Sequence, residues 1–117
     1  MRALLICGAT GLLTAAVPAF AQDLKCEWLQ KEQCQPGQRC GPAALGMWAT
    51  IDLTSQRYQR CDQKGCDAYK AVVSRSGAFT IVELPGRATF LKIGPEGRST
   101  EVTSIMNTVL VSQGICR

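Results

Sequence analysis

Seven cysteines and the absence of histidine define the chemistry open to this chain of 117 residues. Without imidazole, a Ser-His-Asp or Cys-His nucleophile and a histidine metal ligand are excluded. The cysteines form no C-x-x-C redox motif, and the C-x4-C spacing of Cys61 and Cys66 has no second pair to match it, as a zinc site needs. We therefore expect disulfides, and we predict neither a metal nor another cofactor.

The acidic, serine and lysine residues do not form the pairs that catalysis without histidine needs. A glycosidase places two carboxylates across a cleft, and nothing in the sequence brings two acidic residues together. A Ser–Lys dyad works without histidine. Ser74 and Ser76 lie near Lys70, but the order S-x-x-K is absent, as is a glycine-rich phosphate loop with lysine. We predict no catalytic residues and a protein that is not an enzyme; a hydrolase or transferase without histidine is the catalytic alternative.

Residues 1–21 have the pattern of a secretory signal peptide. Arg2 precedes an uncharged apolar stretch over residues 3–17, and Pro18 is followed by Ala-Phe-Ala at residues 19–21, a small-x-small cleavage site. The stretch is shorter than the roughly 20 apolar residues of a membrane span. We expect a single mature domain over residues 22–117, periplasmic or secreted, with no transmembrane segment left after cleavage.

Cleavage would remove Cys7 and leave an even set: Cys26, Cys34, Cys40, Cys61, Cys66 and Cys116. An even number of cysteines in a small exported domain indicates a disulfide framework.

The spacing of these cysteines suggests their pairing. Cys61 and Cys66 flank a short turn that contains Gly65, which suits a disulfide at the neck of a hairpin. Cys34 and Cys40 enclose Pro-Gly, a strong turn signal. Cys26 and Cys116 would then tie the two ends of the domain together, with Cys26 bonded to Cys34 or Cys40 as the alternative.

The mature chain reads as β structure. Apolar residues alternate with mostly polar ones over residues 47–54, where Ala49 and Ile51 share the apolar face, and over residues 88–93, where Leu91 and Ile93 do. Further strands are predicted over residues 69–74, 78–84, 100–106 and 108–112, with turns at Gly65, Gly77, Gly86, Gly97 and Gly114 between or after strands. Such spacing predicts an all-β fold, a small antiparallel meander closed as a barrel or folded as a sandwich, and stapled by disulfides. Residues 24–33 are expected to form a helical turn or two, and residues 34–46 an irregular loop.

The net charge of the chain gives only a coarse indication of the kind of partner that it binds. The formal net charge is +4 at pH 7, and basic residues gather in the central hairpin, Arg60 and Lys64 among them. One interpretation is a surface for an anionic envelope ligand or a protein partner; the other is a solvated surface whose charges keep edge strands apart. Nucleic acid is not expected, because aromatic residues for base stacking are few.

Two resemblances involve residues 48–116. The segments Tyr58–Tyr69 (YQRCDQKGCDAY), Ser76–Phe79 (SGAF) and Val111–Cys116 (VSQGIC) resemble those of small Cys-rich exported proteins of Gram-negative bacteria with no assigned function. That likeness implies a periplasmic address and no active site.

The stapled β pattern with Ser76-Gly-x-Phe79 and the strand Phe90-Leu-Lys92 also resembles the periplasmic C-type lysozyme inhibitors. In that family a serine and a lysine enter the lysozyme cleft, which implies such a role for Ser76 and Lys92. The chain departs from the family pattern where Phe79 stands for tyrosine, Phe90 for tryptophan and Ile93 for glycine.

The function expected from the sequence is therefore an exported, non-enzymatic β module that binds an unidentified envelope ligand or protein partner. Inhibition of a C-type lysozyme is the alternative. The candidate partner-binding residues are Ser76, Lys92, Arg60 and Lys64.

Overall fold

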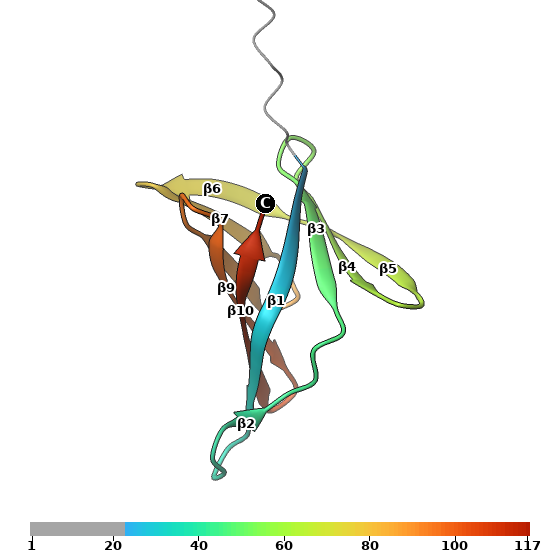
Figure 1. Ribbon diagram of the computed structural model, residues 1–117, viewed down its shortest axis with the longest axis vertical. Coiled ribbons are helices and arrows are strands. Elements are labelled where there is room, and N and C mark those ends of the chain that lie inside the picture. The colour runs from blue at the N-terminus through green and yellow to red at the C-terminus, as the bar shows by residue number, and fades with distance from the viewer. Residues whose placement is uncertain (1–22) are drawn as a thin grey trace, which may run out of the picture.

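The computed structural model describes residues 23–117, which form one antiparallel sheet of ten strands (Figure 1). The signal-peptide prediction lies outside these residues. The strands are β1 (Asp23–Cys34), β2 (Gly41–Pro42), β3 (Trp48–Asp52), β4 (Arg57–Asp62), β5 (Gly65–Lys70), β6 (Val72–Ser76), β7 (Phe79–Leu84), β8 (Thr89–Ile93), β9 (Arg98–Ile105) and β10 (Thr108–Cys116). The predicted all-β class is confirmed, and the sheet curls into a nearly closed barrel.

Two meanders make up this barrel, and β1 joins them. The strand order is β5-β4-β3-β1-β10-β9-β8-β7-β6, with β2 paired to β1 alone. The two end strands, β5 and β6, are consecutive in the chain and meet at Ala71, from which they run to opposite sides (Figure 1). Gln56 holds this junction, because its carbonyl oxygen accepts from the Ala71 amide at 2.9 Å and its side chain accepts from the Val73 amide at 3.0 Å.

The core fills the barrel with the inward residues of each strand. Ala49 and Ile51 are buried, as the alternation over residues 47–54 predicts, and so are Leu91 and Ile93 on β8. Tyr58 is the largest fully buried side chain. The period-2 pattern therefore located the core face correctly on these strands.

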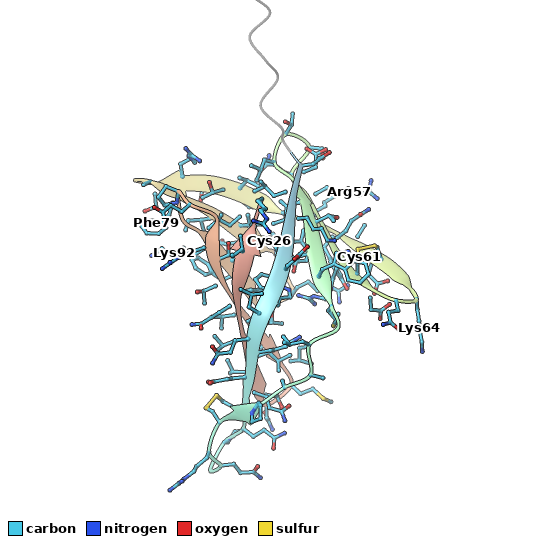
Figure 2. All side chains as sticks on the ribbon, in the orientation of Figure 1. Cys26, Arg57, Cys61, Lys64, Phe79 and Lys92 are labelled. Carbon is cyan, nitrogen blue, oxygen red and sulfur yellow. A yellow bond between two sulfur atoms is a disulfide. The ribbon has the colours of Figure 1, made fainter. Side chains whose placement is uncertain are left out.

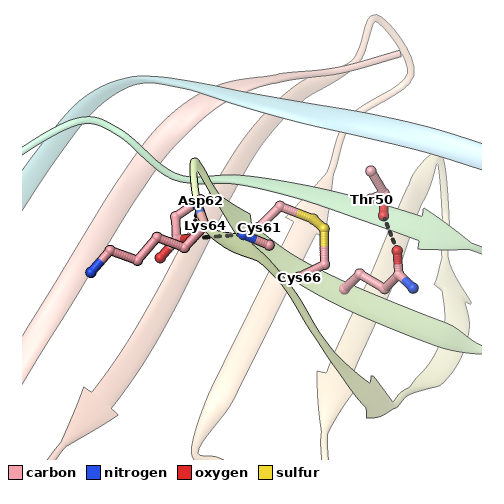
Figure 3. Close-up of a disulfide and its surroundings, with 7 residues drawn as sticks. Thr50, Cys61, Asp62, Lys64 and Cys66 are labelled. Carbon is pink, nitrogen blue, oxygen red and sulfur yellow. Dashed lines mark hydrogen bonds between the residues drawn. A yellow bond between two sulfur atoms is a disulfide. The ribbon is translucent and has the colours of Figure 1, made fainter.

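Three disulfides staple the sheet, with the pairing that the spacing favours: Cys26–Cys116, Cys34–Cys40 and Cys61–Cys66 (Figure 2). Cys26 and Cys116 lie directly opposite each other on β1 and β10 and are both buried. Cys61–Cys66 links β4 to β5 below the hairpin turn, where the Asp62 carboxylate accepts from the backbone amides of Lys64 and Gly65 (Figure 3).

The helical expectation for residues 24–33 is wrong. These residues lie in β1, which pairs with β10 on one side and, on the other, with β3 up to Glu27 and with β2 at Glu32 and Gln33. Pairing on both edges satisfies the backbone of this segment and overrides the weak local preference of its sequence. The expected loop over residues 34–46 begins one residue later, because Cys34 is the last residue of β1, and it is irregular apart from the two-residue strand β2.

Gly114 is not a turn residue, contrary to its predicted role. It lies inside β10, opposite Trp28, and a Cβ atom there would overlap the carbonyl oxygen of Glu27. Directly after Trp28, β1 carries an extra residue, Leu29, at which the register with β10 shifts. This glycine therefore permits a close approach of two backbones beside a β-bulge.

Gly114→Ala is expected to lower the free energy of unfolding by about 2 kcal/mol, because a backbone must shift to admit the methyl group. Urea denaturation measures the change. Gly46→Ala is the matched control, since a Cβ atom at Gly46 meets nothing within 4 Å. Equal stability of the two variants would contradict the close approach.

Candidate functional site

The candidate site lies inside the barrel near the turn between β9 and β10, and it depends on the bulge in β1. Pairing with β10 runs through Trp28 and resumes at Gln30, so that Leu29 is an extra residue. One extra residue inverts the alternation of side chains beyond it. Lys31 therefore shares the inward face with Trp28, and it lies opposite the buried Ser112.

Glu101 on β9 is a buried carboxylate in the same row. It is paired with Ser112 in the sheet and is 5% exposed. The Tyr58 hydroxyl donates to its Oε2 atom at 2.5 Å, while Arg60 Nη2 and the Thr103 hydroxyl each donate to its Oε1 atom at 3.4 Å. The bonds from Tyr58 and Arg60 cross the barrel interior from β4 to β9, and both carboxylate oxygens are engaged.

Arg60 also lies against aromatic rings, with its guanidinium carbon 5.7 Å from the ring centroid of Tyr58 and 5.8 Å from that of Tyr69. Arg87, from the turn between β7 and β8, reaches the same Tyr69 ring at 4.8 Å. Burial, reinforced by the Glu101 charge, raises the pKa of the Tyr58 hydroxyl. Burial opposes the charge of Arg60, but Tyr58 and Glu101 outweigh it and raise the pKa of the guanidinium. At neutral pH the pair is a neutral tyrosine and a charged arginine.

Lys31 differs from Arg60 in having no partner. Burial lowers the pKa of the Lys31 ammonium, the Glu101 carboxylate partly offsets that effect, and the Arg60 charge adds to it. Within residues 23–117, no ion pair or side-chain hydrogen bond engages Lys31 Nζ, and no fully buried side-chain nitrogen or oxygen lacks a partner. The ammonium is thus partly desolvated yet still open to solvent.

These side chains surround a hollow of about 100 Å³, which we call the barrel mouth. Its lining residues are Lys31, Met47, Arg60, Glu101, Thr103, Ile105, Leu110 and Ser112. Two cationic side chains and one carboxylate lie among them, so the charged lining carries one net positive charge.

Larger depressions lie elsewhere on residues 23–117, but no buried charged residue lines them. One of about 410 Å³ is formed by β1, β3, β4 and Arg117. Its Asp52 carboxylate already accepts from the backbone amides of Thr54 and Ser55, and these bonds lower the pKa of the Asp52 carboxyl. The barrel mouth is the better candidate because it combines a hollow with a desolvated, unpartnered charge.

No protein-family model, curated protein or solved structure matches this chain. The site must therefore be interpreted from its own chemistry.

The residues suggested by the lysozyme-inhibitor resemblance lie close together on the outer face of the sheet. Ser76 on β6 pairs directly with Phe79 on β7, and Lys92 Nζ on β8 lies 4.1 Å from the centroid of the Phe79 ring (Figure 2). The inward residues Thr80 and Ile93 separate this group from the barrel interior.

Arg60 and Lys64, the two candidates from the basic hairpin, do not share a surface. Arg60 points inward to Glu101, whereas Lys64 lies in the turn at the tip of the β4–β5 hairpin (Figures 2 and 3). The clustering of charge along the sequence does not produce a cluster in space here, because Arg60 lies on β4 with its side chain turned into the barrel, whereas Lys64 lies beyond the end of that strand.

Sequence reasoning missed Lys31, Tyr58 and Glu101. The signal for Glu101 is weak, because the inward row that it forms with Ser99 and Thr103 is polar, while the apolar Val102 is 36% exposed. Residues 23–117 hold no group of three or more metal-ligating side chains. Over the same range there is no helix that is long and apolar enough to cross a membrane.

Proposed function

We propose that this protein is a non-enzymatic binding module, periplasmic or secreted, which holds an anionic group of a small ligand in the barrel mouth. The unpartnered ammonium of Lys31 beside the Arg60 guanidinium carries this proposal. Three disulfides in a small domain fit the oxidising compartment that the proposal requires.

Placing the Lys31 ammonium in the barrel lowers the stability of the fold. A charge moved out of water without a partner destabilises the fold. An aliphatic side chain of similar length would fill the same space without that cost. Residues that reduce stability in this way are typical of binding sites, where a ligand supplies the missing interaction. An anion in the mouth would pair with Lys31 and stabilise the folded state.

An NMR titration with sodium acetate tests the proposal. We expect chemical-shift changes in the backbone amides of Lys31, Ser112 and Thr103, and we expect Lys31→Met to abolish them. Lys92→Met is the matched control, because it removes a lysine on the outer face, and its spectrum should respond like that of the wild type. Shift changes that survive Lys31→Met, or no change in the mouth at any acetate concentration, would refute the site.

Inhibition of a C-type lysozyme is a second candidate function, and the group of Ser76, Phe79 and Lys92 supports it. A hydroxyl and an ammonium on one rigid outer face could meet the acidic pair of a muramidase cleft. An assay of muramidase activity with a micromolar excess of the protein tests this proposal. We expect inhibition that Ser76→Ala and Lys92→Ala each weaken at least tenfold, while Lys64→Ala leaves it unchanged. Undiminished lysozyme activity across lysozyme classes would exclude this function.

A further inference from the structure

Apolar side chains form a rim above the charged base of the barrel mouth. Met47 and Ile105 line the hollow and are 36% and 50% exposed. The next residue, Met106, is 95% exposed in the turn between β9 and β10. Large apolar side chains left in water beside a charged pocket indicate a surface that is covered when the pocket is occupied.

We infer that the ligand of the barrel mouth is a single-chain amphiphile, with one singly charged carboxylate head and an alkyl tail. This inference rests on the proposed function and names its ligand class. The head would lie between Lys31 and Arg60, and the tail would run outward over Met47, Ile105 and Met106.

The charge of the site selects the head group. Lys31 and Arg60 contribute two positive charges, and the Glu101 carboxylate removes one. A monoanion neutralises what remains, whereas a dianion would leave an excess negative charge beside Glu101. Arg60 directs one of its five N–H donors to Glu101 Oε1. Within residues 23–117 no side-chain hydrogen bond or ion pair engages Lys31 Nζ, so the ammonium offers all three of its donors to the head group.

The hollow is too small to hold the alkyl tail of the ligand, so the tail must lie outside it. A cavity of about 150 Å³ admits a benzene molecule, so the smaller hollow of about 100 Å³ has room for a carboxylate and a methylene or two. A longer chain must therefore lie on the rim, where it is only partly covered. Full burial of a methylene strengthens binding about fourfold, so a half-covered one contributes about twofold.

The chain length of the ligand provides the test. Calorimetric titration with butanoate, hexanoate, octanoate and decanoate, each below its micellar concentration, should give a Kd that falls about twofold with each added methylene. Lys31→Met should weaken octanoate binding at least tenfold. Octanol and octyltrimethylammonium, which carry the same tail without an anionic head, should bind at least tenfold more weakly than octanoate.

Rim variants separate the tail from the head. Ile105→Ser and Met106→Asn should each flatten the dependence on chain length, and Met106→Asn, which alters a residue outside the lining of the hollow, should leave acetate binding unchanged. Asparagine suits position 106 because the backbone φ there is +54°, a conformation that asparagine tolerates. Val72→Ser is the matched control, since Val72 is 50% exposed on β6, away from the mouth, and should change nothing.

The remaining outcomes distinguish a failure of the amphiphile inference from a failure of the proposed anion site. Equal affinity for butanoate and decanoate, both dependent on Lys31, would refute the amphiphile and leave the proposed anion site standing. Binding of no carboxylate at Lys31 would refute both. Equal binding of octanol and octanoate would refute the charged head. Binding to vesicles of anionic phospholipid but to none of the single-chain acids would show a membrane surface as the partner and refute the inference.

Discussion

Replacing Cys26 and Cys116 together by alanine is expected to cost about 4.6 kcal/mol of unfolding free energy in the chain-entropy model. The reason is the sequence separation of 90 residues, which makes this bond close almost the whole described chain into a loop. The bond joins β1 to β10 where the two meanders meet, and both half-cystines are buried. Its loss would therefore loosen the barrel at its central pair of strands.

Denaturation in guanidinium chloride measures this cost, and a second disulfide provides the control. Removing Cys34 and Cys40, which are separated by 6 residues, should cost about 2.4 kcal/mol in the same model. The order of the two effects is the decisive result. If the Cys34–Cys40 variant were the less stable of the two, the long-range bond would not be the principal staple of the fold.

Glu101→Gln is expected to lower the free energy of unfolding by about 3 kcal/mol, because it removes the buried carboxylate that partners the half-buried Arg60 and the buried Tyr58 hydroxyl. The carboxylate accepts from Tyr58, Arg60 and Thr103. An amide has one accepting oxygen and would direct its N–H₂ group against one of these donors. The substitution thus leaves a buried donor without an acceptor.

Urea denaturation at pH 7 measures the effect of Glu101→Gln, and Glu83→Gln is its control. Glu83 lies on the exposed outer face of β7, so its neutralisation should change stability by less than about 0.5 kcal/mol. If Glu101→Gln were as mild as Glu83→Gln, the network that spans the barrel from β9 to β4 would contribute nothing to the fold.

Local signals predicted much of this fold. Period-2 alternation placed Ala49, Ile51, Leu91 and Ile93 on the inner face. The cysteine spacing favoured the disulfide pairing that forms, although it left open a bond from Cys26 to Cys34 or Cys40. Gly77 and Gly86 lie in turns with φ of +59° and +75°, where glycine is the favoured residue. These features depend on a few neighbouring residues, which is why one sequence suffices to find them.

Features that depend on pairing between distant strands could not be predicted. Residues 24–33 form a strand because β10 binds one edge and β3 binds the first half of the other, and neither β3 nor β10 adjoins the segment in the sequence. The same holds for Gly114, where glycine is needed because the backbone of Glu27 leaves no room for a side chain, and not because the chain turns there. Sheet context overrides local preference in both cases.

The candidate site depends on the same long-range effects. Lys31 points inward because one extra residue, Leu29, inverts the alternation of β1. Glu101 is buried because Arg60 and Tyr58 reach it from the far side of the barrel. Neither the bulge nor the crossing hydrogen bonds leave a pattern in the sequence, so Lys31 and Glu101 cannot be distinguished there from ordinary surface residues.

The pKa of the Lys31 ammonium, followed by NMR of 13C-labelled lysine, tests the central claim most directly. In the free protein we expect this pKa to lie below the usual lysine value, because burial opposes the charge. An anion bound in the mouth stabilises the charged form, so octanoate at saturating concentration should raise the pKa, and Lys31→Arg identifies the signal by its loss. A pKa that octanoate leaves unchanged would contradict the account.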